Sequence, residues 1–317
     1  MTYYIFQFDR RNFLGFTLIE LLSVVAIISL LLALLFPAIQ AARSSSRRLS
    51  CSSKMRQIGI AIHSYNDVHG QLPPSKWGIE EYDDGDINNT PEVKSPKHNI
   101  LTFLLPYFEM QAVYCKIDFS VHWYNIKNDA ATKCNLPLFQ CPEAPHKNRY
   151  GDNIYYVSDY ASAEMIEKTE PILKLFEDNI VAKRDGDSYL LAGMLQPDGE
   201  ATTAEAVSDG MSNTMMFFEC GGRPFVYGLS DAEVLGRSES SADWSSNKSP
   251  FYIQEVCGGG KMQLMNCTNY EEIYSFHAGG GNFLFGDGGV RFILESIHPD
   301  KFISAFTATS GDVATPP

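Results

Sequence analysis

The stretch Gly15-Phe16-Thr17-Leu18-Ile19-Glu20 opens a run that stays apolar to Ile39 and has Glu20 as its only charged residue. As a helix, residues 16–39 would be about 36 Å long at ~1.5 Å per residue, enough to cross a hydrocarbon core of roughly 30 Å. A carboxylate within such a segment costs roughly 2.5–3.5 kcal/mol. A plain anchor gains nothing from that cost, so the run predicts a functional partner for Glu20.

A cleaved secretory signal explains this segment poorly. The apolar part of such a signal has about 7–15 residues and leads directly into an A-x-A-like cleavage site. Here the run is longer, and the nearest small residues at that spacing, Ala42 and Ser44, lie beyond Pro37. An uncleaved signal anchor stays open as an alternative, although it accounts for neither Gly15 nor Glu20.

The first helix is expected to continue beyond the apolar run. Apolar residues then recur at steps of three and four, as on one face of a helix: Cys51, Met55, Ile58, Ile62 and Tyr65. Gly70 offers a C-cap, and Pro73-Pro74 cannot continue the helix. We therefore expect a helix in two parts, with residues 16–39 in a membrane or filament core and residues 40–70 packed on a globular head.

The remaining chain predicts an α+β head over residues 71–306 and a flexible tail over 307–317. A helix is expected within 99–116, where Pro106 forces a kink or a break, and a shorter one within 165–179. Short β-like segments between Gly and Asx turns predict a mostly antiparallel sheet. These segments are 138–141, 153–157, 189–195, 214–219, 225–229, 251–256, 283–285 and 290–294.

Charge and cysteine content limit the partners and the compartment. The net charge of −13 argues against nucleic-acid binding. Disulfides are permitted if the head is exported, and an odd count of seven cysteines leaves at least one thiol outside them. The best pair is Cys257–Cys267, which flanks a Gly-rich loop, but spacing alone cannot fix connectivity. Two further pairs are open: Cys115–Cys134 and Cys51–Cys141.

Three more stretches stand out as motifs. The first is QIGIAIHSYND at residues 57–67, and the second is DGMSNT at residues 209–214. The third is FHAGGGNFLFGDGGVRF at residues 276–292, in which nine residues separate His277 from Asp287-Gly288.

Together with the N-terminal stretch, these motifs resemble the large bacterial family of prepilin-like proteins named for the H-x9-DG motif, domain of unknown function 1559. The N-terminal stretch itself resembles the signal of type IV pilins and type II secretion pseudopilins. The resemblance runs from Gly15 to about residue 293. Its departures are mild: Ala278, Gly281 and Gly286 stand where Pro, Ala and Ala are common.

The resemblance implies a processing route. Residues 1–15 would be a leader that prepilin peptidase removes after Gly15, and the new N-terminus, Phe16, would be N-methylated. Glu20 would become the fifth residue. In an assembly its buried carboxylate would pair with the Phe16 ammonium of a neighbouring pilin-like subunit, which removes two unpaired charges together.

Two residue pairs in the motifs admit both a structural and a functional interpretation. His277 and Asp287 could form a metal or catalytic pair. The favoured alternative is a hairpin whose turn contains Asp287 and Gly288, because Asp bonds its own backbone and Gly accepts positive φ. Asp209 and Asn213 likewise predict an Asx turn before a strand, with a metal-binding or sugar-binding loop as the alternative.

The sequence favours a structural protein over an enzyme. It contains no G-x-S-x-G nucleophile elbow, no Walker loop and no dinucleotide-binding loop. No catalytic residue and no cofactor is expected. Among the metal alternatives for the C-terminal motif, calcium on Asp287 is the better one, because some pseudopilins hold calcium in a C-terminal loop.

We therefore expect an α+β, pilin-like fold, in which one long N-terminal helix packs on an antiparallel sheet and a helical insertion precedes that sheet. The expected function is that of a pseudopilin-like subunit in a type II secretion or type IV pilus-like assembly. The protein would cross the bacterial inner membrane once, through residues 16–39, with the head in the periplasm or at the cell surface. The alternative is a membrane-tethered extracytoplasmic receptor for carbohydrate or another ligand, because the head is large for a pseudopilin.

Overall fold

The computed structural model describes residues 17–78, 96–146, 149–150, 155–167, 169–182, 190–197, 202–238, 242–248, 251–253, 256–257, 262–270 and 272–309. The chain forms two compact units, Met1–Ser46 and Arg47–Pro317. The expected leader, residues 1–15, lies outside the described residues, as do Phe16 and the end of the chain from residue 310.

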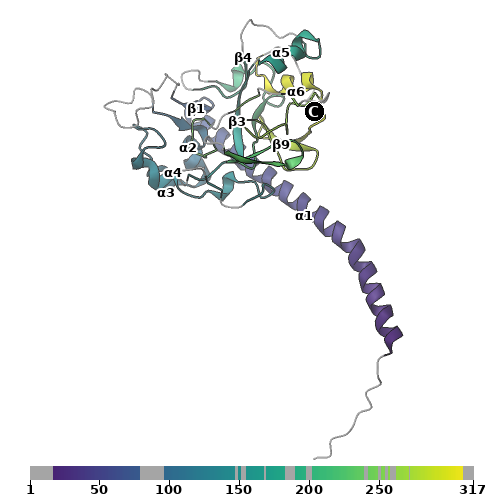
Figure 1. Cartoon of the computed structure of the whole chain (residues 1–317). Coiled ribbons are helices and arrows are strands. Elements are labelled where there is room, and N and C mark those ends of the chain that lie inside the picture. Colours follow the sequence, from purple (N-terminus) through teal and green to yellow (C-terminus); the bar gives the residue numbers. More distant parts are fainter. Residues whose placement is uncertain are drawn as a thin grey trace, which may run out of the picture. The chain divides into compact units, whose positions relative to one another are not determined.

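Helix α1, Leu18–His69, extends through both units (Figure 1). Thr17 and Glu20 start it with a reciprocal capping box. The Thr17 Oγ1 atom accepts the Glu20 backbone N–H at 3.3 Å, and Glu20 Oε2 accepts the Thr17 backbone N–H at 2.9 Å. At the other end Gly70 follows the last helical residue with φ +72°, which is the C-cap expected from the sequence.

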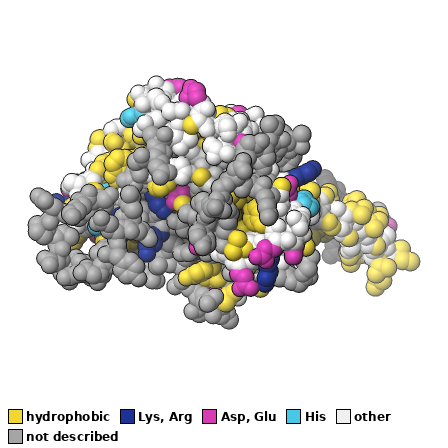
Figure 2. Space-filling view, turned by 90° about the horizontal axis from the view of Figure 1, so that it is seen from above, with side chains coloured by type: hydrophobic (Ala, Val, Ile, Leu, Met, Phe, Trp, Pro, Cys, Tyr) yellow, Lys and Arg dark blue, Asp and Glu magenta, His cyan; other side chains and the backbone are white. Residues whose placement is uncertain are grey.

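In the first unit α1 is apolar around its whole circumference. Its large hydrophobic side chains are exposed from Leu18 to Ile39, and they dominate this part of the molecule in Figure 2. Among the described residues, α1 is the one helix long and apolar enough to cross a membrane, with a mean hydropathy of 2.8 in its most apolar window.

The part of α1 in the second unit is amphipathic. The stripe predicted from the sequence is the buried face, because Cys51, Met55, Ile58 and Ile62 are all fully buried. Tyr65 packs against the same hydrophobic cluster as a partly buried residue.

The second unit is built on one six-stranded sheet with the order β10-β9-β5-β3-β4 and with β8 also paired to β3. Its strands are β3 (Tyr160–Glu167), β4 (Leu190–Ala192), β5 (Met215–Glu219), β8 (Phe251–Ile253), β9 (Gly280–Phe285) and β10 (Val290–Leu294). All of its pairings are antiparallel except that of β3 with β8, which is parallel. The sheet is therefore mainly antiparallel, as predicted, with one parallel neighbour.

Hydrophobic clusters cover the two faces of this sheet. One cluster joins α1 and α2 (Ile100–Leu104) to Phe217 and Leu284. The other joins α5 (Glu170–Glu177) and α6 (Pro299–Phe306) to Phe218 and Phe283. Successive side chains of a strand point to opposite faces, so neighbouring apolar residues of one strand, such as Phe217 and Phe218, belong to different clusters. Every residue of β5 and β9 is accordingly buried.

Smaller elements complete the second unit. Two strand pairs lie outside the main sheet: β1 (Lys76–Trp77) with β2 (His98–Asn99), and β6 (Phe225–Tyr227) with β7 (Glu233–Ser238). Short helical turns precede or connect the strands. They are η1 (Leu105–Phe108), α3 (Gln111–Tyr114), η2 (Ile126–Asn128), α4 (Asp129–Thr132), η3 (Pro137–Phe139), η4 (Ala204–Ala206) and η5 (Leu229–Asp231).

This arrangement confirms the α+β, pilin-like fold class predicted from the sequence. A long N-terminal helix packs on the sheet through its second part, and short helices from α2 to η3 lie before the first strand of the sheet in chain order. They are the helical insertion that the sequence predicts.

Several local predictions differ from the structure. The helix expected at 99–116 is three short helices, because Pro106 starts a tighter turn and Glu109 takes a positive φ of 62°. The helix expected at 165–179 is confined to α5, since β3 continues to Glu167. The strand expected at 138–141 is instead the helical turn η3.

Other boundaries shift in the structure. Strands β3 and β7 and helix α6 are additional elements that the sequence did not predict. Thr307 and Ala308, the first residues of the expected flexible tail, are buried, and the rest of that tail from residue 310 lies outside the described residues. Of the segment 153–157, the described part contributes only isolated bridges at Tyr156 and Val157.

Two disulfides cross-link the second unit. One is Cys257–Cys267, the pair favoured by the sequence, and the other is Cys51–Cys141, which joins α1 to the segment after η3. The third suggested pair, Cys115–Cys134, is not formed, because Cys115 is an exposed thiol and Cys134 donates to a backbone carbonyl of its own helical turn. Cys220 is a buried thiol.

Candidate functional site

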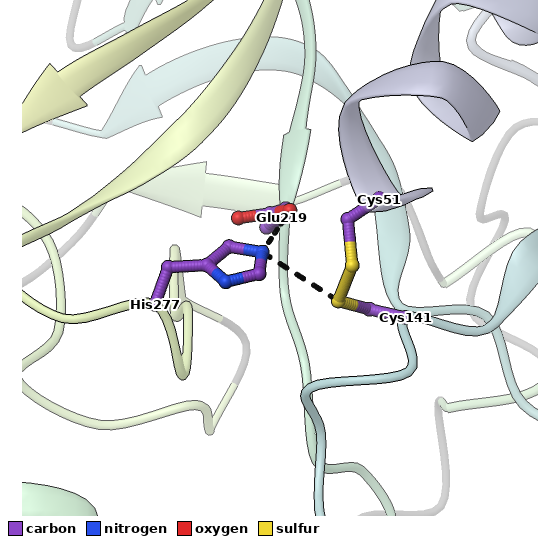
Figure 3. Close-up of side chains that lie close together, drawn as sticks. All are labelled: Cys51, Cys141, Glu219 and His277. Atoms are coloured by element: carbon purple, nitrogen blue, oxygen red, sulfur yellow. Dashed lines mark hydrogen bonds and ion pairs between the residues drawn. A yellow bond between two sulfur atoms is a disulfide. The ribbon is translucent and has the colours of Figure 1, made fainter. Parts of the chain in front are cut away.

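A buried polar cluster lies where α1 meets the end of β5. Four residues form it: Cys51, Cys141, Glu219 and His277 (Figure 3). Cys51 comes from α1, Glu219 is the last residue of β5, and His277 precedes β9. We call these four residues the disulfide–histidine cluster. None is more than 8% exposed, so water contributes little to the solvation of its polar atoms.

His277 is the centre of this cluster. Its Nε2 atom lies 3.3 Å from Glu219 Oε1 and 3.7 Å from Cys141 Sγ. Figure 3 shows one nitrogen of the imidazole ring directed towards both the Glu219 carboxylate and the Cys141 sulfur.

Glu219 is held by further donors, as a buried carboxylate requires. Its Oε2 atom accepts from the Ser275 hydroxyl at 2.6 Å and from the Asn282 backbone N–H at 3.0 Å. Its Oε1 atom accepts from Asn282 Nδ2 at 2.9 Å. The side chain is therefore fixed in one orientation, with Oε1 directed towards His277.

The backbone of Cys141 is hydrogen-bonded to a buried ion pair. The Asp159 carboxylate pairs with Arg149 and accepts the Cys141 backbone N–H at 2.7 Å and the Gly222 N–H at 3.1 Å. Burial first, and then the carboxylates of Glu219 and Asp159, raise the pKa of Tyr160. The site is thus a region of low dielectric in which every charged group has a fixed partner.

Hydrogen bonds and an ion pair, in addition to the disulfide, connect the segment around η3 to α1. Lys54 of α1 donates to the backbone carbonyls of Pro137 and Gln140, each at 2.6 Å. Burial lowers the pKa of Lys54, and the charge of Asp159 opposes that shift. About one helical turn before Cys51 in α1, Arg47 forms an ion pair with Glu143.

A second junction is formed by the turn between β9 and β10. Asp287 Oδ1 accepts the Gly289 N–H at 2.8 Å, and Asp287 Oδ2 lies 3.1 Å from Arg291 Nη2. Gly288 takes φ +79°, the left-handed region that favours glycine. Asp287 therefore sits in a hairpin turn of the kind that the sequence favours.

The three sequence motifs meet at this second junction. A Cβ atom on Gly59 would lie 3.4 Å from Gly288 Cα, and one on Gly288 would lie 3.6 Å from the His63 ring. The Gly286 N–H donates to the Thr214 carbonyl at 2.9 Å. The first motif thus contacts the turn of the third motif, and the second motif is hydrogen-bonded to the residue that precedes this turn. We call this contact the glycine junction.

Asp209 and Asn213 form a local turn in the second motif. The Asn213 Nδ2 atom donates to the Asp209 carbonyl at 3.0 Å, and Gly210 takes φ +92°. Arg291 Nη1 then reaches the Ser212 carbonyl at 2.5 Å, which ties this turn to the hairpin.

His277 and Asp287 lie at opposite ends of β9. Six residues of strand span about 20 Å at ~3.3 Å per residue, so the two side chains do not share one metal or catalytic site. His277 instead joins Glu219 and the disulfide. The sequence alone predicts no role for Glu219 or Gly59; the one local signal is a glutamate at the end of the apolar run Met215–Glu219.

A surface hollow of about 420 Å³ borders the start of the third motif through Phe276. Its lining combines aromatic side chains with three carboxylates: Glu143, Pro145, His146, Tyr227, Asp231, Glu233 and Phe276. The Asp231 carboxylate accepts the Tyr274 hydroxyl at 2.8 Å. We call it the acidic hollow.

Comparison with protein families identifies the relatives of the chain. The model of a family described as "Protein of unknown function (DUF1559)" matches residues 40–300. The chain belongs to the DUF1559 family. A "Prokaryotic N-terminal methylation motif" matches residues 10–36 of this DUF1559 protein. No curated protein and no solved structure matches it.

The methylation motif and α1 together define the N-terminal part of this DUF1559 protein. It is a prepilin-like protein, and its described residues include one apolar helix of membrane-spanning length. The motif implies processing by prepilin peptidase and pilin-type assembly. Gly15 and Phe16, the expected cleavage and methylation residues, lie outside the described part of the chain, whereas Glu20 is in the first turn of α1.

Proposed function

We propose that this DUF1559 protein is a pseudopilin-like structural subunit of a type II secretion or type IV pilus-like assembly. Prepilin peptidase removes residues 1–15 after Gly15, and Phe16 becomes the methylated N-terminus. Residues 16–39 cross the inner membrane or enter a filament core, and the head is extracytoplasmic. Its role is structural, and it needs neither a catalytic residue nor a cofactor.

The position of Glu20 carries this proposal. Its Oε2 atom accepts from both the backbone N–H and the hydroxyl of Thr17, at 2.9 and 2.7 Å. Its Oε1 atom has no hydrogen-bond partner among the described residues. The carboxylate is thus held at the start of α1 with one oxygen available, and the residue that holds it, Thr17, directly follows in sequence the residue that would carry the new ammonium group.

The fit between this carboxylate and an ammonium supports assembly over simple anchoring. A carboxylate in the membrane interior is expensive unless it is paired. A neighbouring subunit brings such a partner in the form of its own Phe16 amine, so the pairing stabilises contacts between subunits. A monomeric anchor would obtain no such compensation.

The two disulfides support an extracytoplasmic head. Cys51–Cys141 and Cys257–Cys267 both lie in the second unit. Disulfides form and persist mainly in oxidising compartments, which include the bacterial periplasm and cell surfaces.

Mass spectrometry of the mature N-terminus tests the proposal. Protein purified from membranes of a host with a prepilin peptidase should begin at a methylated Phe16. The matched control is Gly15→Val, which should retain residues 1–15. Intact Met1 in the unaltered protein, or cleavage near Ala42, would overturn the processing route.

The acidic hollow favours a second candidate function, that of a membrane-tethered binding protein. Tyr227 and Phe276 offer aromatic surface beside the carboxylates of Asp231 and Glu233, and ligand sites for sugars and similar molecules combine such groups. Binding of the full-length protein to an array of glycans, in detergent, tests this role. Binding that survives Glu20→Val and is lost in Tyr227→Ala would favour it; no binding would leave the subunit role alone.

A further inference from the structure

The disulfide–histidine cluster has the composition of a metal site. One ligand atom from each of Cys51, Cys141, Glu219 and His277 lies within 4.8 Å of the other three, and all four residues are buried. Two sulfurs, one imidazole nitrogen and one carboxylate oxygen are ligands that Zn²⁺ accepts in a tetrahedral arrangement. Bonds of about 2.0–2.3 Å would place such ligands roughly 3.3–3.8 Å apart. The distances of 3.3 Å from His277 Nε2 to Glu219 Oε1 and of 3.7 Å to Cys141 Sγ already fit, whereas the two bonded sulfurs have to move apart by about 1.7 Å once the disulfide is reduced.

The disulfide keeps this site closed to metal in the oxidised protein. A thiolate is the form of cysteine that binds metal, and neither sulfur is a thiolate while the S–S bond exists. We propose that reduction of the Cys51–Cys141 disulfide by a dithiol converts the cluster into a four-ligand Zn²⁺ site.

The conversion requires no reactant other than the dithiol and Zn²⁺. One thiolate of the reductant attacks the Cys141 sulfur and displaces the Cys51 thiolate; Cys141 is 8% exposed, whereas Cys51 is fully buried. The second thiol of the reductant resolves the mixed disulfide and leaves oxidised as a cyclic disulfide. Two electrons pass to the protein, and Zn²⁺ then displaces the remaining thiol protons to solvent.

The surroundings already orient the Glu219 carboxylate, and His277 faces the cluster through its Nε2 atom. Ser275 and Asn282 hold the Glu219 carboxylate, with Oε1 facing His277 Nε2 at 3.3 Å. His277 Nε2 also faces the Cys141 sulfur at 3.7 Å, so a metal between them would meet the nitrogen directly. The hydrogen bond from the Cys141 N–H to Asp159 fixes the backbone of the third ligand. Such outer partners determine the orientation of metal ligands in proteins.

The site would preserve a structural link. In the oxidised state, Cys51–Cys141 ties α1 to the segment after η3 across 90 residues of sequence. A Zn²⁺ ion bound to both sulfurs would keep that tie in reducing surroundings and would add β5 and the segment before β9 to it. The inference is independent of the proposed role as a pilin-type subunit.

Metal binding to the full-length protein in detergent tests the proposal. The protein is reduced with dithiothreitol, desalted without oxygen and titrated with Zn²⁺, and bound metal is counted by native mass spectrometry. The background carries Cys115→Ser, Cys134→Ser, Cys257→Ser and Cys267→Ser, so that the buried Cys220 is the one thiol left besides Cys51 and Cys141. We expect one Zn²⁺ per reduced chain and none per oxidised chain. Titration with Co²⁺ should give the absorption of a cobalt–thiolate bond in the reduced chain only.

Two variants in this background assign the ligands. Cys51→Ser with Cys141→Ser should abolish binding. Because that variant also loses the disulfide, His277→Gln is the decisive comparison: it keeps the disulfide, its oxidised fold can be verified, and its reduced form should bind Zn²⁺ at least tenfold more weakly. Absence of metal from the reduced chain, equal binding by the oxidised chain, or unchanged affinity in His277→Gln would each overturn the proposal.

Discussion

Gly59 of α1 lies against Gly288 of the β9–β10 turn so closely that a Cβ atom on Gly59 would stand 3.4 Å from the Gly288 Cα atom. The same Cβ would stand 2.9 Å from Cδ1 of Leu284, a fully buried side chain. The close contact with Leu284 gives a structural reason for glycine at position 59. At Gly288 the reason is its positive φ of 79°, because a Cβ atom there would lie 3.6 Å from the His63 ring, an ordinary packing distance.

Gly59→Leu should therefore destabilise the head. The larger side chain has to displace Leu284 or the turn backbone, and overpacking of this kind costs about 1–3 kcal/mol. Urea unfolding of the full-length protein in detergent measures the change. Ser53→Leu, at an exposed position of the same helix, is the control and should shift stability by less than about 0.5 kcal/mol. Equal stability of Gly59→Leu and the unaltered protein would contradict the packing argument.

The two disulfides should differ in their contribution to stability. Cys51–Cys141 closes a separation of 90 residues and Cys257–Cys267 one of 10. In the loop-entropy description these lengths correspond to roughly 4–5 and 2–3 kcal/mol. Replacement of each pair by serine, followed by urea unfolding, should rank the Cys51/Cys141 variant as the less stable by about 2 kcal/mol. The reverse ranking would show that strain or local packing, rather than chain entropy, dominates.

Glu219, the buried partner of His277, and Asp287 at the other end of the H-x9-DG motif should respond differently to truncation. Glu219→Ala leaves the buried groups of Ser275, Asn282 and His277 without their acceptor, which should cost about 3–5 kcal/mol. Asp287→Ala removes an exposed turn bond and an exposed ion pair with Arg291, which should cost about 1 kcal/mol or less. Unfolding free energies of the two variants check this, and similar losses would mean that the exposed turn carries more than its contacts suggest.

The long-period patterns of the sequence predict the framework of this fold well. The buried stripe of α1 from Cys51 to Ile62 follows helical spacing, and β10 lies at the residues where an apolar run stands between turns. Such patterns are local: the periodicity of a segment and the glycine that ends it are visible without knowledge of the rest of the chain.

The central strand β3 could not be predicted in this way. Its apolar pattern is broken by Ser162 and Glu164, both of which are buried. Glu164 is tolerated there because Ser75 donates to it at 2.8 Å and Lys76 pairs with it at 2.8 Å. Those partners are almost 90 residues away in sequence, so the strand depends on tertiary contacts that no local pattern reveals.

The candidate site was hidden for the same reason. Glu219 and His277 are 58 residues apart, and Cys51 and Cys141 are separated by 90. The sequence identifies His277 as part of a motif, but the nine-residue spacing directs attention to Asp287 rather than to Glu219. Strand β9 lies between His277 and Asp287, so the two ends of the motif are at different junctions of the fold.

The stability of the head should fall in mild acid because of His98. Burial, assisted by the charge of His122 and opposed by the bond to Val121 and the charge of Asp118, lowers the pKa of His98 from 6.5 to about 4. The unfolded chain therefore takes up a proton near pH 6.5 while the folded chain does not. Stability is full above pH 6.5 and decreases towards pH 4, by roughly 3 kcal/mol at most.

The variant His98→Gln isolates this contribution. Its side-chain amide can replace the His98 Nε2 atom as donor to the Val121 carbonyl, a bond of 2.9 Å in the structure. Unfolding free energies measured from pH 7 to pH 4 should decline less steeply in the variant than in the unaltered protein. Parallel curves would show that His98 does not titrate differently in the two states.

The charge of Glu20 should matter for assembly, and its hydrogen bonds for the start of α1. Glu20→Gln keeps an acceptor for the Thr17 N–H, since glutamine also completes a capping box, but it removes the charge that an ammonium would pair with. Glu20→Val removes both. Both variants should insert into the membrane, and cross-linking between subunits in the membrane should fall at least tenfold in both. If Glu20→Gln cross-links like the unaltered protein while Glu20→Val does not, the carboxylate acts through the capping box, and pairing with the Phe16 ammonium is excluded as its role.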